Sequence, residues 1–156
     1  MPFRIVPGIS AGIGGTAGAG IPLTHRTLAR SVVFATGHDA HGGLPDVDFA
    51  ALARNDVLVF YMALRHAGSI AERLIAAGRA CDEPIAFVSD ATTPLQRVTL
   101  ATLATAGAVA AGLDRHAPTL IVAGPVLALR DMIAPLQQGM PMTLDPAPRA
   151  VAGAHQ

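Results

Sequence analysis

Residues 4–26, RIVPGISAGIGGTAGAGIPLTHR, constrain the fold of this chain more than any other segment. A short apolar start ends at Pro7-Gly8, and the residues that follow are almost all Gly, Ala, Ser and Thr. Side chains this small allow another backbone or a flat ligand to approach closely, because no bulky group holds it away. The segment ends in His25 and Arg26, shortly after Pro22. It therefore predicts a place of close approach, followed by two side chains that can carry positive charge.

The same region must be weighed as a membrane span, since residues 5–24 carry no charge. Gly8 and Gly12 have the spacing of helix contacts in membranes. Two prolines, six glycines and few large side chains nevertheless make residues 5–24 a poor span. A signal peptide is also disfavoured, because Pro7-Gly8 would interrupt its apolar core. We expect a cytoplasmic domain that does not enter a membrane.

The overall composition limits the remaining classes of function. The 156 residues suffice for one domain with a core and are too few for two domains of ordinary size. Charged residues make up 14% of the chain, against about 25% in typical soluble domains, so we expect another domain or subunit to cover part of the surface. With 11 basic and 11 acidic residues, the net charge is zero and gives no basis for binding nucleic acid. The single cysteine, Cys81, excludes an internal disulfide.

Strand-like and helix-like segments alternate along the chain. Predicted strands are residues 3–6, 31–36, 57–62, 84–89, 96–100 and 119–123. Predicted helices are residues 11–18 capped by Ser10, 49–53 capped by Asp48, 67–77 ended by Gly78, an Ala-rich helix ending near 113, and 126–133. This alternation predicts an α/β fold with a mixed sheet flanked by helices. Residues 1–135 would form the domain, and the proline-rich residues 136–156 would form a mobile tail.

Two other site interpretations fit the residues less well. A dinucleotide fingerprint needs G-x-G-x-x-G after a strand and an acidic residue about twenty positions later, but the glycines from Gly12 onward lack the third member. A tight contact between helix and sheet is the simpler interpretation. His38, Asp39 and His41 could ligate a metal, yet no matching cluster occurs elsewhere, so we interpret them as a solvated loop and predict no metal.

Several separated segments resemble the uroporphyrinogen-III C-methyltransferases of the tetrapyrrole methylase family. They are VPGISAGIGG with IPLTHR, SVVFATGHD, VLVFYMAL, EPIAFVSDATTPLQR and TLIVAGPVLALRD, and together they cover about residues 3–131. The resemblance implies the fold of the C-terminal domain of a tetrapyrrole methylase. It also implies that S-adenosylmethionine methylates uroporphyrinogen III at C2 and C7, giving precorrin-2. The segments are nearest to the branch that serves cobalamin synthesis, although the same reaction feeds sirohaem.

The resemblance also implies which residues form the site. In this family S-adenosylmethionine lies between two α/β domains and is held largely by backbone groups. Ser10 and Ala11 would contact this cofactor, and Ala91 would offer its backbone to the adenosine. Met62 would lie at the mouth shared by cofactor and substrate. His25 and Arg26, within the THR match, are our candidates for binding the carboxylates of the tetrapyrrole substrate, although composition alone favours a surface pair.

The chain departs from the family pattern in two respects. Pro125 stands where the family often has a charged residue. No residue matches the family's first half, which carries a Gly-Gly-Asp loop and the groups proposed for proton handling, so the catalytic residues stay unassigned. We therefore expect a companion N-terminal half, a homodimer in the intact enzyme and no methylation by this chain alone. The alternatives are a methylase of a later corrin precursor and a non-catalytic remnant.

Overall fold

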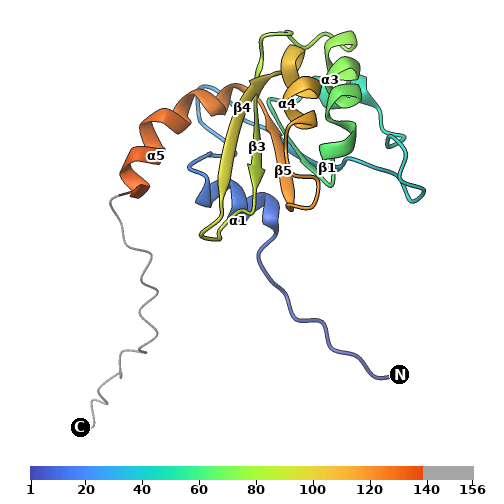
Figure 1. Ribbon diagram of the computed structural model, residues 1–156, viewed down its shortest axis with the longest axis vertical. Helices are drawn as coiled ribbons and strands as arrows, with labels where there is room; N and C mark the ends of the chain where they lie inside the picture. Colours follow the sequence, from blue (N-terminus) through green and yellow to red (C-terminus); the bar gives the residue numbers. More distant parts are fainter. Residues whose placement is uncertain (139–156) are drawn as a thin grey trace.

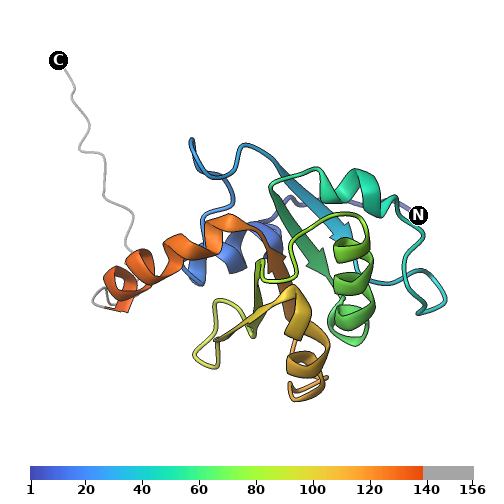
Figure 2. The same cartoon turned by 90° about the horizontal axis from the view of Figure 1, so that it is seen from above.

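The computed structural model describes residues 1–138, which form one five-stranded sheet with helices on both faces (Figures 1 and 2). The strands are β1 (Val32–Thr36), β2 (Val57–Tyr61), β3 (Pro84–Ser89), β4 (Arg97–Thr102) and β5 (Thr119–Ala123), in the sheet order β1-β2-β5-β3-β4. β1 and β2 are parallel, whereas β5 runs antiparallel to both β2 and β3, and β4 runs antiparallel to β3. The prediction of a mixed sheet is confirmed, and β1, β2 and β3 all end at the same edge.

The helices divide between the two faces of this sheet. They are α1 (Ala11–Gly18), α2 (Phe49–Ala53), α3 (Ala67–Ala76), α4 (Ala106–Ala111) and α5 (Arg130–Gln138), with short 3-10 turns η1 (Leu64–His66), η2 (Leu103–Thr105) and η3 (Pro125–Leu129). Residues of α2, α3 and α4 pack on one face against the side chains of Phe60 and Phe87. The other face, which carries Val59 and Val88, packs against residues 19–29 and η3. None of the described helices has the length and apolar character needed to cross a membrane.

The central strands are buried on both sides, as their uninterrupted apolar runs predict. In β2 and β3 successive side chains alternate between the two packed layers, because side chains point to opposite faces along a strand. The predicted start of α2 and the predicted end of α3 are also found in the structure. The Asp48 carboxylate accepts a bond of 2.9 Å from the backbone N–H of Ala51 at the start of α2. Gly78 follows α3 with a φ of +101°, a conformation that glycine adopts without strain.

Two predicted elements differ from the structure. The predicted strand at residues 3–6 is wrong: residues 1–9 are irregular, and the side chains of Phe3 and Ile5 are 84% and 80% exposed. An extended segment becomes a strand only when a neighbouring strand pairs with it, and none among the described residues does so. The last helix continues to Gln138, beyond the predicted end at residue 133, so residues 136–138 belong to α5 rather than to a tail. The rest of the predicted tail, residues 139–156, lies outside the described residues.

Candidate functional site

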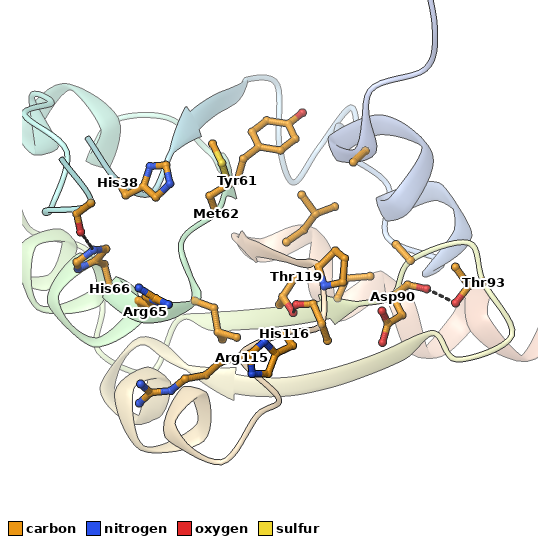
Figure 3. Close-up of a pocket in the computed structure, with 18 residues that line it drawn as sticks. His38, Tyr61, Met62, Arg65, His66, Asp90, Thr93, Arg115, His116 and Thr119 are labelled. Atoms are coloured by element: carbon orange, nitrogen blue, oxygen red, sulfur yellow. Dashed lines mark hydrogen bonds between the residues drawn. The ribbon is translucent and has the colours of Figure 1, made fainter. Parts of the chain in front are cut away.

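A cleft of about 580 Å³ opens at the edge of the sheet where β1, β2 and β3 end (Figure 3). Its walls come from the loop after β1, from η1, from residues 90–93 after β3, and from residues 115–120 leading into β5. The first residue of α1, Ala11, completes the lining. Open α/β sheets bind their ligands outside the carboxyl ends of parallel strands, so the topology itself favours this edge.

The backbone turns sharply at this edge, immediately after two of the strands. Met62 follows β2 with a φ of +54°, and Asp90 follows β3 with a φ of +48°. Left-handed backbone costs a residue with a Cβ roughly 1–2 kcal/mol. Strain of this kind concentrates at binding and catalytic sites, where the surrounding fold holds it in place. Met62 and Asp90 line the cleft, whereas Thr92, the third described non-glycine residue with a positive φ (+65°), belongs to the 90–93 loop but not to the lining.

α1 approaches the cleft closely because its residues are small. A Cβ placed on Gly12 would lie 2.2 Å from the Tyr61 hydroxyl oxygen, and one on Gly15 would lie 2.9 Å from the Cβ of Ala91. The hydroxyl groups of Ser10 and Tyr61 are 2.5 Å apart, which ties the start of α1 to the end of β2. The predicted close approach is confirmed: the small residues let α1 pack against the end of β2 and the 90–93 loop.

The loop after β1 is folded by its own polar groups. The carboxylate of Asp39 accepts bonds from the backbone N–H groups of Gly43 and His41, and these bonds hold its pKa below the ordinary value of 3.8. His66 of η1 donates from Nε2 to the carbonyl oxygen of Gly42 at 2.9 Å, which fastens the loop to the cleft wall. Within residues 1–138, no three His, Cys, Asp or Glu side chains come together as a metal site.

The structure brings together most of the predicted site residues. Ala11, Met62 and Ala91 come from three separate segments and all line the cleft. Ser10 lies just outside the lining and contacts it through Tyr61.

The two substrate candidates lie elsewhere. The backbone N–H of His25 donates to the carbonyl oxygen of Ala29 at 2.7 Å, and the N–H of Ala29 donates to the carbonyl oxygen of His25 at 2.9 Å. These two bonds close a turn in which Arg26 is exposed to solvent. Neither His25 nor Arg26 lines the cleft. A contact between this turn and the substrate therefore stays a prediction.

Sequence reasoning missed several residues that the fold places in the cleft. Tyr61 is the last residue of β2 and Asp90 directly follows β3, so both lie at the strand ends where ligand-binding side chains gather. Arg65 and Arg115 also line the cleft, although neither belongs to a recognisable motif. Only the sheet topology shows that the segments carrying these two arginines meet at one edge.

A mixed α/β sheet with a cleft at the ends of its parallel strands defines a domain that binds small molecules. The model of the family described as Tetrapyrrole (Corrin/Porphyrin) Methylases matches residues 1–107, well over half of the chain. The chain belongs to the tetrapyrrole methylase family.

Individual relatives agree with this family. The chain is 48% identical over 151 residues to a uroporphyrinogen-III C-methyltransferase from Sinorhizobium sp., covering 94% of this chain and 54% of the relative. It is 49% identical over 135 residues to a siroheme synthase from Tolumonas auensis, covering 86% of this chain and 28% of the relative. The chain thus spans about half, or less, of the length of these curated relatives.

Solved structures show the same architecture. The uroporphyrin-III C-methyltransferase of Thermus thermophilus, solved in complex with S-adenyl homocysteine, is 33% identical with a TM-score of 0.69, covering 82% of this chain and 55% of that one. Its native form gives a TM-score of 0.70 and covers 82% of this chain and 53% of that one. A cobalt precorrin-4 methyltransferase at 22% identity and a TM-score of 0.69, covering 80% of this chain and 52% of that one, shares the fold.

Proposed function

We propose that this chain forms the cofactor-binding half of a methyltransferase that transfers methyl groups from S-adenosylmethionine to uroporphyrinogen III. The proposed product is precorrin-2, methylated at C2 and C7, for cobalamin or sirohaem synthesis. One observation carries the proposal: Ala11, Met62 and Ala91, the positions that match the family's cofactor residues, line a single cleft. The relative from Thermus thermophilus, which has the same fold, supports the cofactor, because it was solved with S-adenyl homocysteine.

The cleft suits this cofactor in size and in chemistry. Its volume of about 580 Å³ falls within the range of roughly 300–1,000 Å³ that is usual for small-molecule sites. Ala11 and Ala91 have methyl side chains, so a ligand can reach the backbone N–H and C=O groups beside them. Met62 is 59% exposed and presents a soft, apolar thioether at the cleft wall. When bound, S-adenosylmethionine supplies an electrophilic methyl group on its sulfonium.

This chain's own residues would act by binding and positioning. The Ser10–Tyr61 hydrogen bond fixes the first turn of α1, and with it the backbone of Ala11. Met62 would keep water away from the transferred methyl group. Methylation of a pyrrole carbon also requires the loss of a ring proton, which needs a positioned base. We assign that base to a companion half rather than to any residue described here.

A partly uncovered apolar surface supports the companion half. Four side chains of the irregular first segment, Phe3, Ile5, Val6 and Ile9, are each at least 72% exposed. Apolar side chains gathered in one segment commonly mark a surface that another protein element covers. We propose that this companion, on the same or another chain, packs against residues 1–9 and closes the cleft. The domain, with α5 included to Gln138, would then act as the C-terminal methylase domain of a protein that forms homodimers.

Reconstitution tests the proposal. Residues 1–156 alone should show no measurable transfer of radiolabelled methyl groups to uroporphyrinogen III, whereas mixing with the N-terminal half of the Sinorhizobium relative should restore transfer. Turnover by the chain alone, at the rate of full-length relatives, would contradict the need for a companion. A mixture that binds S-adenosylhomocysteine but methylates only later corrin precursors would correct the substrate. A mixture without cofactor binding would identify a non-catalytic domain.

A further inference from the structure

Basic side chains outnumber acidic ones in the lining of the cleft. Two arginines and three histidines line it, while Asp90 is the sole carboxylate among the described lining residues. The basic residues are His38 after β1, Arg65 and His66 in η1, and Arg115 and His116 in the loop before β5. The whole chain has a formal net charge of zero. With histidines counted as neutral in both cases, the two arginines and one carboxylate give the described lining a net charge of +1. Just outside the lining, the Asp114 carboxylate accepts a bond of 2.9 Å from the backbone N–H of His116.

The basic groups also gather at one end of the cleft. Figure 3 shows His38, His66, Arg65 and Arg115 toward one side of the pocket and Asp90 and Thr93 on the opposite side, with His116 between them. The cofactor position Ala91 is adjacent to Asp90 in the chain. The cleft thus has a basic end and an end that carries a carboxylate.

The basic end is available to a ligand. Within the described part of the chain, the only ion pair joins Arg79 and Glu83, so neither Arg65 nor Arg115 is neutralised by a carboxylate of residues 1–138. The ring nitrogen Nδ1 of His38 is buried and has no hydrogen-bond partner among the described residues. A buried polar group without a partner is unfavourable, and a ligand oxygen at this position would satisfy it.

We propose that this basic end binds carboxylate groups of the methyl acceptor, with Arg65 and Arg115 as the principal contacts. The proposal rests on the proposed function, in which the acceptor carries acetate and propionate groups around its rim. Arginine suits such groups because its planar guanidinium can donate two parallel hydrogen bonds to one carboxylate. The acceptor's carboxylates could engage several cations at once, which compensates for the weakness of any single exposed ion pair.

The cofactor also carries a carboxylate, but the net positive charge of the cofactor argues against its binding at the basic end. S-adenosylmethionine carries a sulfonium and an ammonium group against one carboxylate, so it is a cation overall. A concentration of basic side chains would repel it, whereas the end with Asp90 would attract it. The acceptor is strongly anionic and has the opposite preference. The uneven charge of the cleft would therefore separate the two reactants.

Binding of uroporphyrin III, the stable oxidised form of the acceptor, tests this assignment on residues 1–156. Fluorescence titration at low ionic strength should show binding to the wild-type chain. Arg65→Ala and Arg115→Ala should each weaken the affinity by about 3- to 10-fold, and added salt should reduce this difference. The control is Arg54→Ala, which removes an exposed arginine from the opposite edge of the sheet, before β2 begins, and should leave the affinity unchanged. Coproporphyrin III, in which methyl groups replace the acetates, should bind more weakly than uroporphyrin III.

Each contrary result overturns the assignment. The first such result is no uroporphyrin binding by the wild-type chain. The second is an equal loss of uroporphyrin affinity in Arg54→Ala and in the cleft variants, and the third is a loss of affinity confined to Arg26→Ala. A weakened affinity for S-adenosylhomocysteine with unchanged uroporphyrin binding would assign the arginines to the cofactor's carboxylate instead. Failure of the proposed function looks different: the reconstituted protein would not methylate uroporphyrinogen III, while Arg65→Ala would still weaken uroporphyrin binding. Methylation with an unchanged substrate KM in Arg65→Ala and Arg115→Ala would preserve the function and refute this inference.

Discussion

The hydroxyl groups of Ser10 and Tyr61 lie 2.5 Å apart, although 51 positions separate the two residues in the sequence. Ser10 precedes α1, and Tyr61 is the last residue of β2. The ring of Tyr61 also stacks on Phe34 of β1, with 6.1 Å between the ring centroids. Tyr61 thus joins the start of α1 to the two parallel strands at the edge where the cleft opens.

The Ser10–Tyr61 bond should contribute more to binding than to stability. Ser10→Ala and Tyr61→Phe should each lower the free energy of unfolding by about 0.5–1 kcal/mol, because the bond is exposed to water. The double variant should lose little more than either single variant, since both changes remove the same bond. Urea denaturation of the four proteins checks this coupling, and additive losses would contradict it. In the reconstituted protein, either variant should also weaken S-adenosylhomocysteine binding, because the backbone of Ala11 is no longer fixed.

Two glycines of α1 should respond in opposite ways to alanine. The Cβ of Gly12→Ala would lie 2.2 Å from the Tyr61 hydroxyl and 2.6 Å from Phe34 Cε1, so both rings must move. Overpacking of this kind typically costs about 1–3 kcal/mol. The matched control, Gly14→Ala, meets only the side chain of Ile9, at 3.0 Å, and that side chain is exposed and free to move.

Helix propensity decides the outcome at the control position. Alanine in place of glycine stabilises a helix interior by roughly 0.5–1 kcal/mol, so Gly14→Ala should be neutral or stabilising. Thermal denaturation of the two variants should therefore move in opposite directions from the wild type. Equal destabilisation of both would show that α1 is not packed against Tyr61 in solution.

The carboxylate of Asp56 lies at the end of the sheet opposite the cleft, where β1 and β2 begin. It should make the free energy of unfolding depend on pH. Asp56 accepts bonds from the backbone N–H groups of Arg30 and Ser31, at 2.7 and 3.0 Å, and from the Ser31 hydroxyl. The backbone bonds, that from Arg30 first, hold the pKa of Asp56 below its ordinary value of 3.8. A pKa that is lower in the folded state stabilises the fold above the unfolded-state pKa, and this contribution disappears as the pH falls through the folded-state pKa.

Asp56→Asn should therefore be less stable than the wild type at neutral pH, and the difference should shrink as the pH falls below 3.8. Urea denaturation across this range checks the expectation. The control is Asp82→Asn, on an exposed turn, whose carboxylate has no hydrogen bond among the described residues. A difference between Asp56→Asn and the wild type that stays constant with pH would show that the carboxylate is not held in this way.

Much of the fold was predictable because local pattern and tertiary environment agree. The strands at residues 84–89 and 119–123 have the predicted bounds, since short apolar runs of this length are suited to a sheet buried on both faces. Residues 3–6 show a similar apolar start but form no strand, because pairing depends on a partner that local sequence does not reveal. Ser10 was correctly placed before a helix, yet its hydroxyl bonds Tyr61 instead of capping α1.

The site was predictable only where short motifs carry it. Ala11, Met62 and Ala91 lie within segments that resemble the methylase family, and the structure places all three around one cleft. Arg65 and Arg115 belong to no such motif, and they share the cleft because η1 and the loop before β5 meet at one edge of the sheet. Charge that is assembled by topology in this way has no signal in the linear sequence.

Met62 gives a test that separates binding from folding. Its side chain is 59% exposed, so Met62→Ala should change the free energy of unfolding by less than about 0.5 kcal/mol. Alanine keeps the left-handed backbone, with a φ of +54°, whereas Met62→Gly removes the Cβ that makes this conformation unfavourable. Met62→Gly should therefore be at least as stable as Met62→Ala. Both variants remove the thioether from the cleft.

In the reconstituted protein, both Met62 variants should weaken S-adenosylmethionine binding or lower turnover, because the thioether would border the transferred methyl group. Thermal denaturation and a cofactor titration on the same samples check the two halves of this prediction. The matched control is Met132→Ala, which removes a methionine of similar exposure from α5, outside the cleft lining. Cofactor titrations that do not differ between Met62→Ala, Met132→Ala and the wild type would remove Met62 from the site. A loss of cofactor affinity confined to the Met62 variants, with stability nearly unchanged, would place this side chain at the cofactor.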